Sequence, residues 1–323
     1  MRRSTVIWLI IAALLVVTGS IIFTGAMTMV KWDFSKLSTS KYETNTYKID
    51  EDFTSISVDT NTAKISFTLS SDSSCSVICR EEENMKHSVQ VRDGSLMIEV
   101  IDKRSWYQHI GINFGSPEIT VCIPKGEYGS LTVKTDTGDV MIPKELSFKS
   151  MEITASTANV TSLALVSDKV RIKTSTGDIR VEGISPFSLD LSASTGRISV
   201  SDVRCKGDIT VKVSTGNAYL TNTECKSLIS TGSTGKTILK QVIVLEKLSV
   251  ERSTGDVELD SCDAAEIYIK TDTGDVKGSL LSDKVFITET DTGKIKVPSS
   301  AEGGRCEITT DTGDIIIEIL GNS

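Results

Sequence analysis

Hydrophobic and polar residues change their pattern once along the chain, near residue 30. Residues 5–30 are predominantly apolar and contain no charged side chain. At about 1.5 Å per residue, a helix of this length reaches about 39 Å, enough to cross a hydrocarbon core of about 30 Å with some tilt. From residue 51 onwards, apolar residues instead recur at every second position in short runs, as in half-buried β-strands. The pattern predicts one transmembrane helix over residues 5–30, followed by an all-β part.

The alternating runs belong to a repeat centred on Thr-Gly. Thr is present in all ten units, from Thr137 to Thr312, and a second strand pattern precedes each turn. The position two residues after the Gly is Val or Ile in eight of the ten units. The aligned turn positions, 19 or 20 residues apart, are Gly138, Ala158, Gly177, Gly196, Gly216, Gly235, Gly255, Gly274, Gly293 and Gly313.

A period this regular predicts a solenoid before any other fold. Each unit is expected to form one coil, with two short strands, a corner at Ser/Asp-Thr-Gly and a second corner near Ser-Asp or Lys. Coils stacked in register as parallel strands about 4.8 Å apart would give a rod of about 48 Å. The prediction is an all-β protein, a parallel β-solenoid (β-helix) of about ten coils over residues 131–323.

The residues that recur at equivalent positions of the Ser/Asp-Thr-Gly turn have structural explanations. Stacked Thr hydroxyls could satisfy one another's hydrogen bonds, and the Ser or Asp two residues before the Gly could accept a backbone N–H. Ala63 and Ala158 also occupy the Gly column. A left-handed backbone would cost Ala roughly 1–2 kcal/mol, so we expect close packing of coils, more than positive φ, to select Gly.

Residues 51–130 are predicted to form an antiparallel β cap that includes the first coil. Residues 57–65 resemble a degenerate unit, with Thr62-Ala63 in place of Thr-Gly. Further alternating runs follow, and the Arg-Asp-Gly at 92–94 predicts a hairpin. A terminal coil exposes backbone donors, so a cap is expected there.

The flanks of the apolar segment predict its orientation. Arg2 and Arg3 precede it, so residues 1–4 are expected to be a cytoplasmic tail and the rest of the chain extracellular. Lys31 and Trp32 suit the far interface, and the polar residues 31–50 suit a stalk. The alternative is a cleaved signal peptide, although its apolar region is normally only 7–15 residues long.

Composition excludes several classes of protein. The formal net charge is -8, and an acidic surface disfavours nucleic-acid binding. The seven cysteines are odd in number and irregularly spaced, so they are no disulfide framework and are expected to be mostly core thiols. A zinc motif is not expected either, since no Cys-x-x-Cys occurs and His87 and His109 are the only histidines. We therefore predict no cofactor.

One loop is a candidate binding site. Residues 105–115 concentrate Trp106, Tyr107, His109 and Phe114 between two predicted strands. The favoured alternative is that these rings fold onto the end of the solenoid. Contact with the membrane surface is a third interpretation.

The acidic turns raise the question of calcium. Calcium takes six to eight oxygen ligands, which stacked Asp-Thr-Gly-Asp turns could supply in part. The glycine-rich nonapeptide of calcium-binding β-rolls is absent, and lysines interleave with the acids. Solvated turn acids are therefore favoured over a metal site. The calcium candidates are Asp136, Asp139, Asp272, Asp275, Asp291, Asp311 and Asp314.

No catalytic residue is predicted. Residues 230–237 end like a P-loop, but they lie in phase with the Thr-Gly repeat. A Ser/His/Asp set is not expected, because neither histidine lies in the repeat. Enzymes that cleave glycosides use paired carboxylates, but here the Asp residues recur from turn to turn, as structure would dictate.

The chain resembles the bacterial putative-adhesin family, a domain of unknown function in membrane-anchored envelope proteins of Gram-positive bacteria. The resemblance rests on the strand at 119–124 ending in Pro, on Leu-Thr-Val-Lys-Thr-Asp-Thr-Gly-Asp-Val at 131–140, and on the recurring Thr-Gly-Asp-Val/Ile units. It extends from about residue 51 to the end. It implies a β-solenoid at the envelope, in surface interaction or stress signalling, without catalytic residues.

The sequence thus predicts a non-enzymatic, single-pass protein of the cell membrane. Its expected partners are the membrane and an envelope polymer or membrane protein. A membrane-tethered component of envelope-stress regulation and a polysaccharide-acting β-helix enzyme are the alternatives.

Overall fold

The computed structural model describes residues 3–29, 31–32, 41–104 and 115–320. One helix, α1 (Arg3–Met29), precedes a structure built from strands. Within α1, Thr5–Met29 is long and apolar enough to cross a membrane, and all its side chains except that of Met27 are exposed.

The strands fall into short elements within each coil and a few longer ones that continue around a bend. They are β1 (Tyr42–Ile49), β2 (Ser55–Thr60), β3 (Lys64–Leu69), β4 (Cys75–Glu82), β5 (Met85–Arg92), β6 (Ser95–Asp102), β7 (Glu118–Ile123), β8 (Glu127–Thr135), β9 (Val140–Ile142), β10 (Ser147–Thr157), β11 (Val160–Ser162), β12 (Leu165–Val166), β13 (Lys169–Thr176), β14 (Ile179–Glu182), β15 (Ser188–Thr195), β16 (Ile198–Arg204), β17 (Asp208–Thr215), β18 (Ala218–Cys225), β19 (Ser227–Thr234), β20 (Thr237–Thr254), β21 (Val257–Thr273), β22 (Val276–Leu280), β23 (Lys284–Thr292), β24 (Ile295–Lys296), β25 (Gly304–Thr312) and β26 (Ile315–Ile319).

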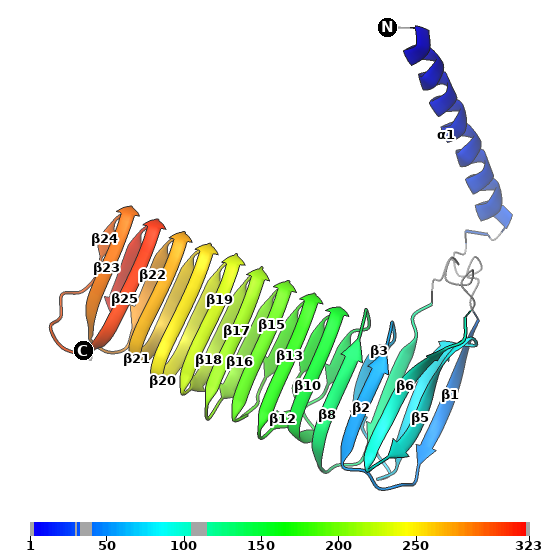
Figure 1. Ribbon diagram of the computed structural model, residues 1–323, viewed down its shortest axis with the longest axis horizontal. Coiled ribbons are helices and arrows are strands. Elements are labelled where there is room, and N and C mark those ends of the chain that lie inside the picture. The colour runs from blue at the N-terminus through cyan, green and yellow to red at the C-terminus, as the bar shows by residue number, and fades with distance from the viewer. Residues whose placement is uncertain (1–2, 30, 33–40, 105–114, 321–323) are drawn as a thin grey trace.

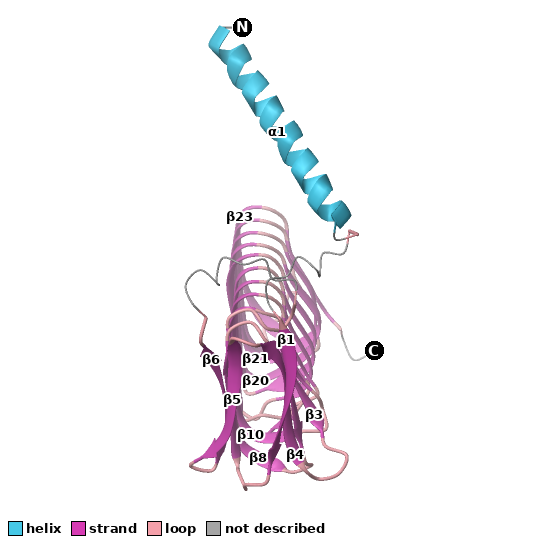
Figure 2. Ribbon diagram, turned by 90° about the vertical axis from the view of Figure 1, so that its right-hand side faces the viewer, coloured by secondary structure: helices cyan, strands magenta, loops and turns pink. Residues whose placement is uncertain are grey.

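The predicted parallel β-solenoid is confirmed. Equivalent strands of successive coils pair in parallel and in register, so that Leu189 lies beside Ile209 and Val181 beside Val200. The result is the rod of stacked coils in Figure 1, seen from its N-terminal end in Figure 2. Alternate residues of each strand are buried between the two faces and form one continuous apolar core.

The second corner contains a bend that the sequence did not predict. Six residues after the turn Gly, successive coils place a residue with positive φ, for example Asp202 (54°), Asn222 (47°) and Gln241 (51°). Asn and Asp tolerate this conformation better than most residues. The Asn222 amide also donates to the Asp202 carboxylate of the neighbouring coil at 2.6 Å. The long strands β20 and β21 each pass through such a bend.

The N-terminal end is closed by antiparallel strands. The degenerate coil, β2 and β3, packs between β8–β9 on one side and β6–β7 on the other. Beyond it, β4 pairs antiparallel with β7 and with β1, and β5 pairs antiparallel with β6. The expected hairpin is present, because Asp93 (φ 51°) and Gly94 (φ 71°) connect β5 to β6 in the two-residue turn that such hairpins favour.

Part of the predicted stalk belongs to this cap. Residues 42–49, which the sequence analysis placed in the stalk, form β1 along the whole length of β4. The physical reason is alternation, since Tyr47 and Ile49 point inward and pack against the core.

At the C-terminal end, the coils do not stack in chain order. The last coil, β25–β26, pairs with β21 and β22 on one side and with β23 and β24 on the other. The penultimate coil, β23–β24, is therefore the outermost one (Figure 1). The connection at residues 281–283 passes over the inserted coil, and residues 297–303 lead back into it.

The turn glycines are required for two reasons. A Cβ built at any of the nine would lie 1.7–2.2 Å from a backbone carbonyl oxygen of the neighbouring coil, which confirms the predicted close packing. However, seven of the nine also have φ between 122° and 158°, so the expectation that positive φ matters less is wrong for these seven. At Gly138 and Gly293, close approach alone explains the glycine.

The aligned Thr residues of successive coils make different hydrogen bonds from those predicted. The Thr residues before the Gly do stack in register, as Thr157 does on Thr176. No hydrogen bond joins their hydroxyls in the described part of the chain. Instead, a second Thr, three residues before the Gly, bonds to the turn carbonyl of the adjacent coil, as in Thr271 to Gly255 (3.2 Å) and Thr310 to Gly274 (3.1 Å).

The P-loop-like segment makes room for a buried arginine. Arg252 is 3% exposed and occupies the position where other coils have a small residue. Its guanidinium donates to Thr237 Oγ1 at 2.7 Å and to the Val213 carbonyl at 3.2 Å. A Cβ at Gly232 would lie 1.8 Å from Arg252 Nη1. Burial lowers the pKa of Arg252 to about 10. Gly232 and Thr237, both departures from the repeat, are thus explained by this one side chain.

Candidate functional site

An accessible groove lies on the outer face of the strands that follow the Thr-Gly turn. Residues one, three and five positions after the Gly point outward there and align across coils. The groove has a volume of about 500 Å³. It is lined by Lys236, Ile238, Leu239, Lys240, Asp256, Glu258, Leu259, Asp260, Asp275, Lys277 and Gly278.

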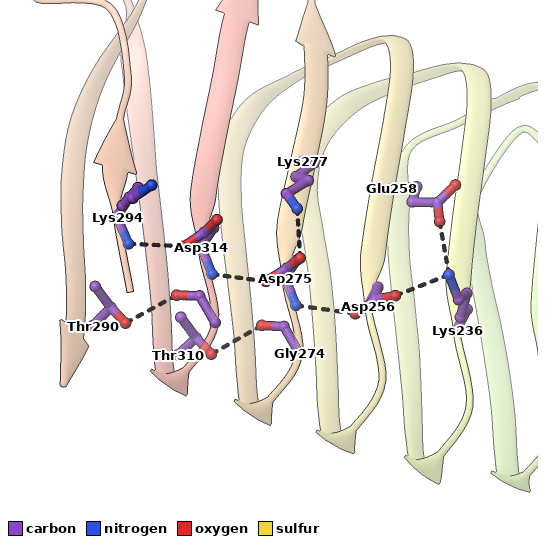
Figure 3. Close-up of polar contacts among 11 residues, drawn as sticks. Lys236, Asp256, Glu258, Gly274, Asp275, Lys277, Thr290, Lys294, Thr310 and Asp314 are labelled. Carbon is purple, nitrogen blue, oxygen red and sulfur yellow. Dashed lines mark hydrogen bonds and ion pairs between the residues drawn. The ribbon is translucent and has the colours of Figure 1, made fainter. Parts of the chain in front are cut away.

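Charge alternates across this groove. One coil contributes the row Asp256, Glu258 and Asp260, and the coils on either side contribute Lys236 and Lys277. Lys236 Nζ lies 2.9 Å from an Asp256 oxygen and 3.2 Å from a Glu258 oxygen (Figure 3). The groove is therefore a mixed-charge surface, with cations and anions side by side.

These ion pairs shift the protonation equilibria of the groove. Hydrogen bonds to Asp256 and Glu258 raise the pKa of Lys236. The same lysine holds the pKa of Asp256 below its ordinary value, and Lys277 does so for Asp275. Each of these shifts favours the charged form, so Lys236, Asp256 and Asp275 carry their charges at neutral pH.

A ladder of carboxylate and amide side chains runs beside the groove. Where it is Asp or Asn, the residue immediately after the turn Gly accepts the backbone N–H of its counterpart in the next coil. Asp256 accepts from Asp275 at 3.1 Å, Asp275 from Asp314 at 2.8 Å and Asp314 from Lys294 at 2.9 Å (Figure 3). The ladder follows the spatial order of the coils, including the inserted last one. The sequence analysis predicted that the Ser or Asp two residues before the Gly accepts a backbone N–H. In the structure, the Asp or Asn one residue after the Gly is the acceptor.

The calcium candidates are distributed in two ways. Asp139, Asp275 and Asp314 belong to the ladder and already accept backbone N–H groups. Asp272, Asp291 and Asp311 are exposed at the turns, and Asp136 lies 3.4 Å from the Ser156 hydroxyl. In the described ranges, none of these carboxylates belongs to a group of three or more ligand atoms within 4.8 Å of one another. Calcium binding therefore stays a prediction, and these carboxylates do not converge on a common point among the described residues.

A buried polar cluster lies in the N-terminal cap. His87 Nδ1 lies 2.8 Å from Glu81 Oε2, and its Nε2 lies 2.9 Å from Thr60 Oγ1. This is the order of a nucleophile, histidine and acid, with Thr and Glu in place of the Ser and Asp that the sequence analysis considered. No sequence pattern indicated this cluster, because Glu81 and His87 come from the cap strands β4 and β5, outside the Thr-Gly repeat. The three residues are at most 3% exposed, so no substrate reaches Thr60 in this conformation.

The remaining candidate residues are those of the aromatic loop and the seven cysteines. Trp106, Tyr107, His109 and Phe114 lie outside the described residues, so the binding-loop interpretation stays a prediction. The seven cysteines are free, and six of them are buried, which confirms their role as core thiols. Burial raises the pKa of the Cys225 and Cys306 thiols to about 12.

An N-terminal apolar helix followed by a parallel β-solenoid with an outward-facing charged groove defines a class of repeat protein. The chain belongs to the Toastrack DUF4097 family, whose model matches residues 53–210 and 198–323. This agrees with the predicted resemblance to putative adhesins. No curated protein matches the chain.

Solved structures give similar folds at low identity. A putative adhesin from Parabacteroides merdae has a TM-score of 0.44 at 13% identity, over 87% of this chain and 98% of that one. A putative adhesin from Bacteroides fragilis has a TM-score of 0.37 at 13% identity, over 86% and 97%. A putative lipid binding protein from Parabacteroides distasonis has a TM-score of 0.38 at 10% identity, over 87% and 98%.

Proposed function

We propose that this protein is a single-pass membrane protein with a short cytoplasmic N-terminus and an extracellular solenoid. The proposal is supported by the predominantly apolar segment Thr5–Met29, whose 25 residues exceed the length of a signal-peptide core. Arg2 and Arg3 before the helix favour a cytoplasmic N-terminus.

The anchor has a direct test. We expect the mature chain to retain residues 1–30 and to stay in the membrane fraction after alkaline extraction, because α1 spans the bilayer. N-terminal sequencing of the membrane-bound protein, with protease added to intact cells, measures both claims. Leu14→Arg is the control, since a charge at the helix centre costs about 2.5–3.5 kcal/mol of insertion and should release the chain. A mature N-terminus near residue 27 would instead mean a cleaved signal peptide.

We propose further that the solenoid is a non-enzymatic interaction surface and that the groove binds an envelope polymer carrying both cationic and anionic groups. The observation that carries this is the row of three acids between lysines in an open groove. Exposed ion pairs contribute only about 0–1 kcal/mol each, so a polymer can exchange partners with Lys236 or Asp256 at little cost. A rigid rod would hold these charges at a fixed spacing.

The groove proposal predicts a loss of binding. The triple variant Lys236→Gln, Lys240→Gln, Lys277→Gln should bind isolated cell-wall polymer at least about tenfold more weakly, because three charge-assisted contacts are removed. Binding of the purified full chain to wall polymer, at low and high salt, measures it. The matched control is Arg171→Gln with Asp190→Asn, an exposed pair 3.1 Å apart on the strands before the turn.

Equal binding by the triple variant and the control would sink the groove proposal. Two other outcomes would point to the alternatives. Recovery of a membrane sensor after crosslinking in cells would support envelope-stress regulation. Release of soluble glycan by the purified protein would support an enzyme.

A further inference from the structure

Three chemically different ligand groups meet inside the N-terminal cap. Cys79 and Glu81 lie two residues apart on β4 and point to the same side, and His87 approaches from β5. One ligand atom of each lies within 4.8 Å of the other two. All three side chains are buried, with Cys79 and Glu81 at 0% exposure.

The surrounding hydrogen bonds occupy the outer atoms of this cluster. Glu81 Oε1 accepts from the Asn45 amide at 2.8 Å and from the Tyr47 hydroxyl at 3.5 Å. His87 Nε2 is paired with Thr60 Oγ1. Such partners fix the orientation of metal ligands in known metal sites.

The inner atoms face one another. Glu81 Oε2 lies 2.8 Å from His87 Nδ1 and also accepts the His87 backbone N–H at 2.6 Å, which leaves it a further lone pair for a metal. The Cys79 thiol beside them has no hydrogen-bond partner among the residues that the structure describes. A fully buried sulfur without a partner, next to a carboxylate and an imidazole, is an arrangement that a metal ion would complete.

We propose that Cys79 Sγ, Glu81 Oε2 and His87 Nδ1 bind a zinc ion, with water at the fourth position. A mixed sulfur, nitrogen and oxygen set suits Zn²⁺ and disfavours the all-oxygen ions calcium and magnesium. Zinc–ligand bonds of about 2.0–2.3 Å need only a small separation of Oε2 from Nδ1, since these two atoms are now at hydrogen-bond distance.

The protons on the ligand atoms must rearrange when the ion enters. Zn²⁺ binds a thiolate, so Cys79 Sγ releases its proton to solvent on binding. His87 Nδ1 must offer its lone pair to the metal, which places the imidazole proton on Nε2, beside Thr60 Oγ1. Without metal, burial and the nearby Glu81 raise the pKa of Cys79 to about 12, so the thiol is neutral.

This site escaped the sequence analysis because it has no zinc-finger spacing. The excluded pattern was Cys-x-x-Cys, whereas these ligands are a Cys-x-Glu pair on one strand and a histidine after the next turn. Only the antiparallel cap brings them together.

The experiment is metal analysis of the purified full chain in detergent, after refolding with Zn²⁺ and dialysis against metal-free buffer. We expect one zinc per chain by elemental analysis. After exchange with Co²⁺, we expect a thiolate-to-cobalt charge-transfer absorption band. Cys79→Ser and His87→Gln should each lower retained zinc at least about tenfold. Cys306→Ser, which removes another fully buried thiol in the solenoid, should retain it.

If the folded wild-type protein retains no zinc, the proposal is overturned. The cluster is then a set of hydrogen-bonded side chains that only stabilises the cap. The same holds if Cys79→Ser retains as much zinc as Cys306→Ser. If the ligand variants fail to fold, the cobalt spectrum of the wild-type chain decides, since absence of the charge-transfer band excludes Cys79 as a ligand.

Discussion

Gly255→Ala is expected to lower the free energy of unfolding by about 2–6 kcal/mol. Gly255 has a φ of 142°, and a Cβ there would lie 2.1 Å from the Gly235 carbonyl oxygen. An unfavourable backbone conformation costs about 1–3 kcal/mol and overpacking about 1–3 kcal/mol more. Urea unfolding of the purified protein, followed by circular dichroism, measures the change.

Two other glycines separate these causes. Gly183 has a φ of 70° with no atom within 4 Å of a built Cβ, so Gly183→Ala should cost only about 1–2 kcal/mol. Gly293 has the close contact, 2.0 Å from the Gly313 carbonyl oxygen, without the left-handed backbone. If Gly255→Ala lowers the free energy of unfolding no more than Gly183→Ala does, close approach of the coils does not contribute to the requirement for Gly255.

Arg252→Ala is expected to destabilise the rod by about 2–4 kcal/mol, mainly because it leaves a void in the core. Gly232 and Thr237 leave room for the guanidinium, and neither can grow to fill the space. Thermal and urea unfolding of the variant measure the loss.

Arg252→Met is the matched control for the charge. It keeps most of the volume, and removing a buried charge is often neutral or stabilising. We expect it to remain within about 1 kcal/mol of the wild-type protein. Equal destabilisation by the Ala and Met variants would show that the hydrogen bonds to Thr237 and Val213, rather than the filled volume, hold this coil.

The repeat made most of the fold predictable. Thr-Gly at a constant spacing, with alternating apolar residues on either side, specifies strand, corner and register together. The order of the last coils could not be predicted, because every unit offers its neighbours the same pattern. β25 can therefore pack on β21 as well as β23 could.

The cap was predictable only in outline. Its hairpin at 92–94 has a local signal, whereas β1 depends on pairing with β4, and polar residues such as Asn45 obscured its alternation. The candidate sites were less predictable than the fold, because they too depend on contacts between residues that are distant in sequence. The charged groove needs three coils aligned side by side, and the cluster of Thr60, Glu81 and His87 needs strands far apart in sequence.

The inserted last coil also constrains how the protein is made. A nascent chain can add coils one at a time up to β22 as they emerge. β23 and β24 emerge next, yet in the described structure they pair only with β25 and β26, which are synthesised after them. This end of the rod therefore cannot be assembled coil by coil and must wait until β25 and β26 have been made. A prematurely terminated product would lack not only its missing residues but also the docking place of the coil made before them.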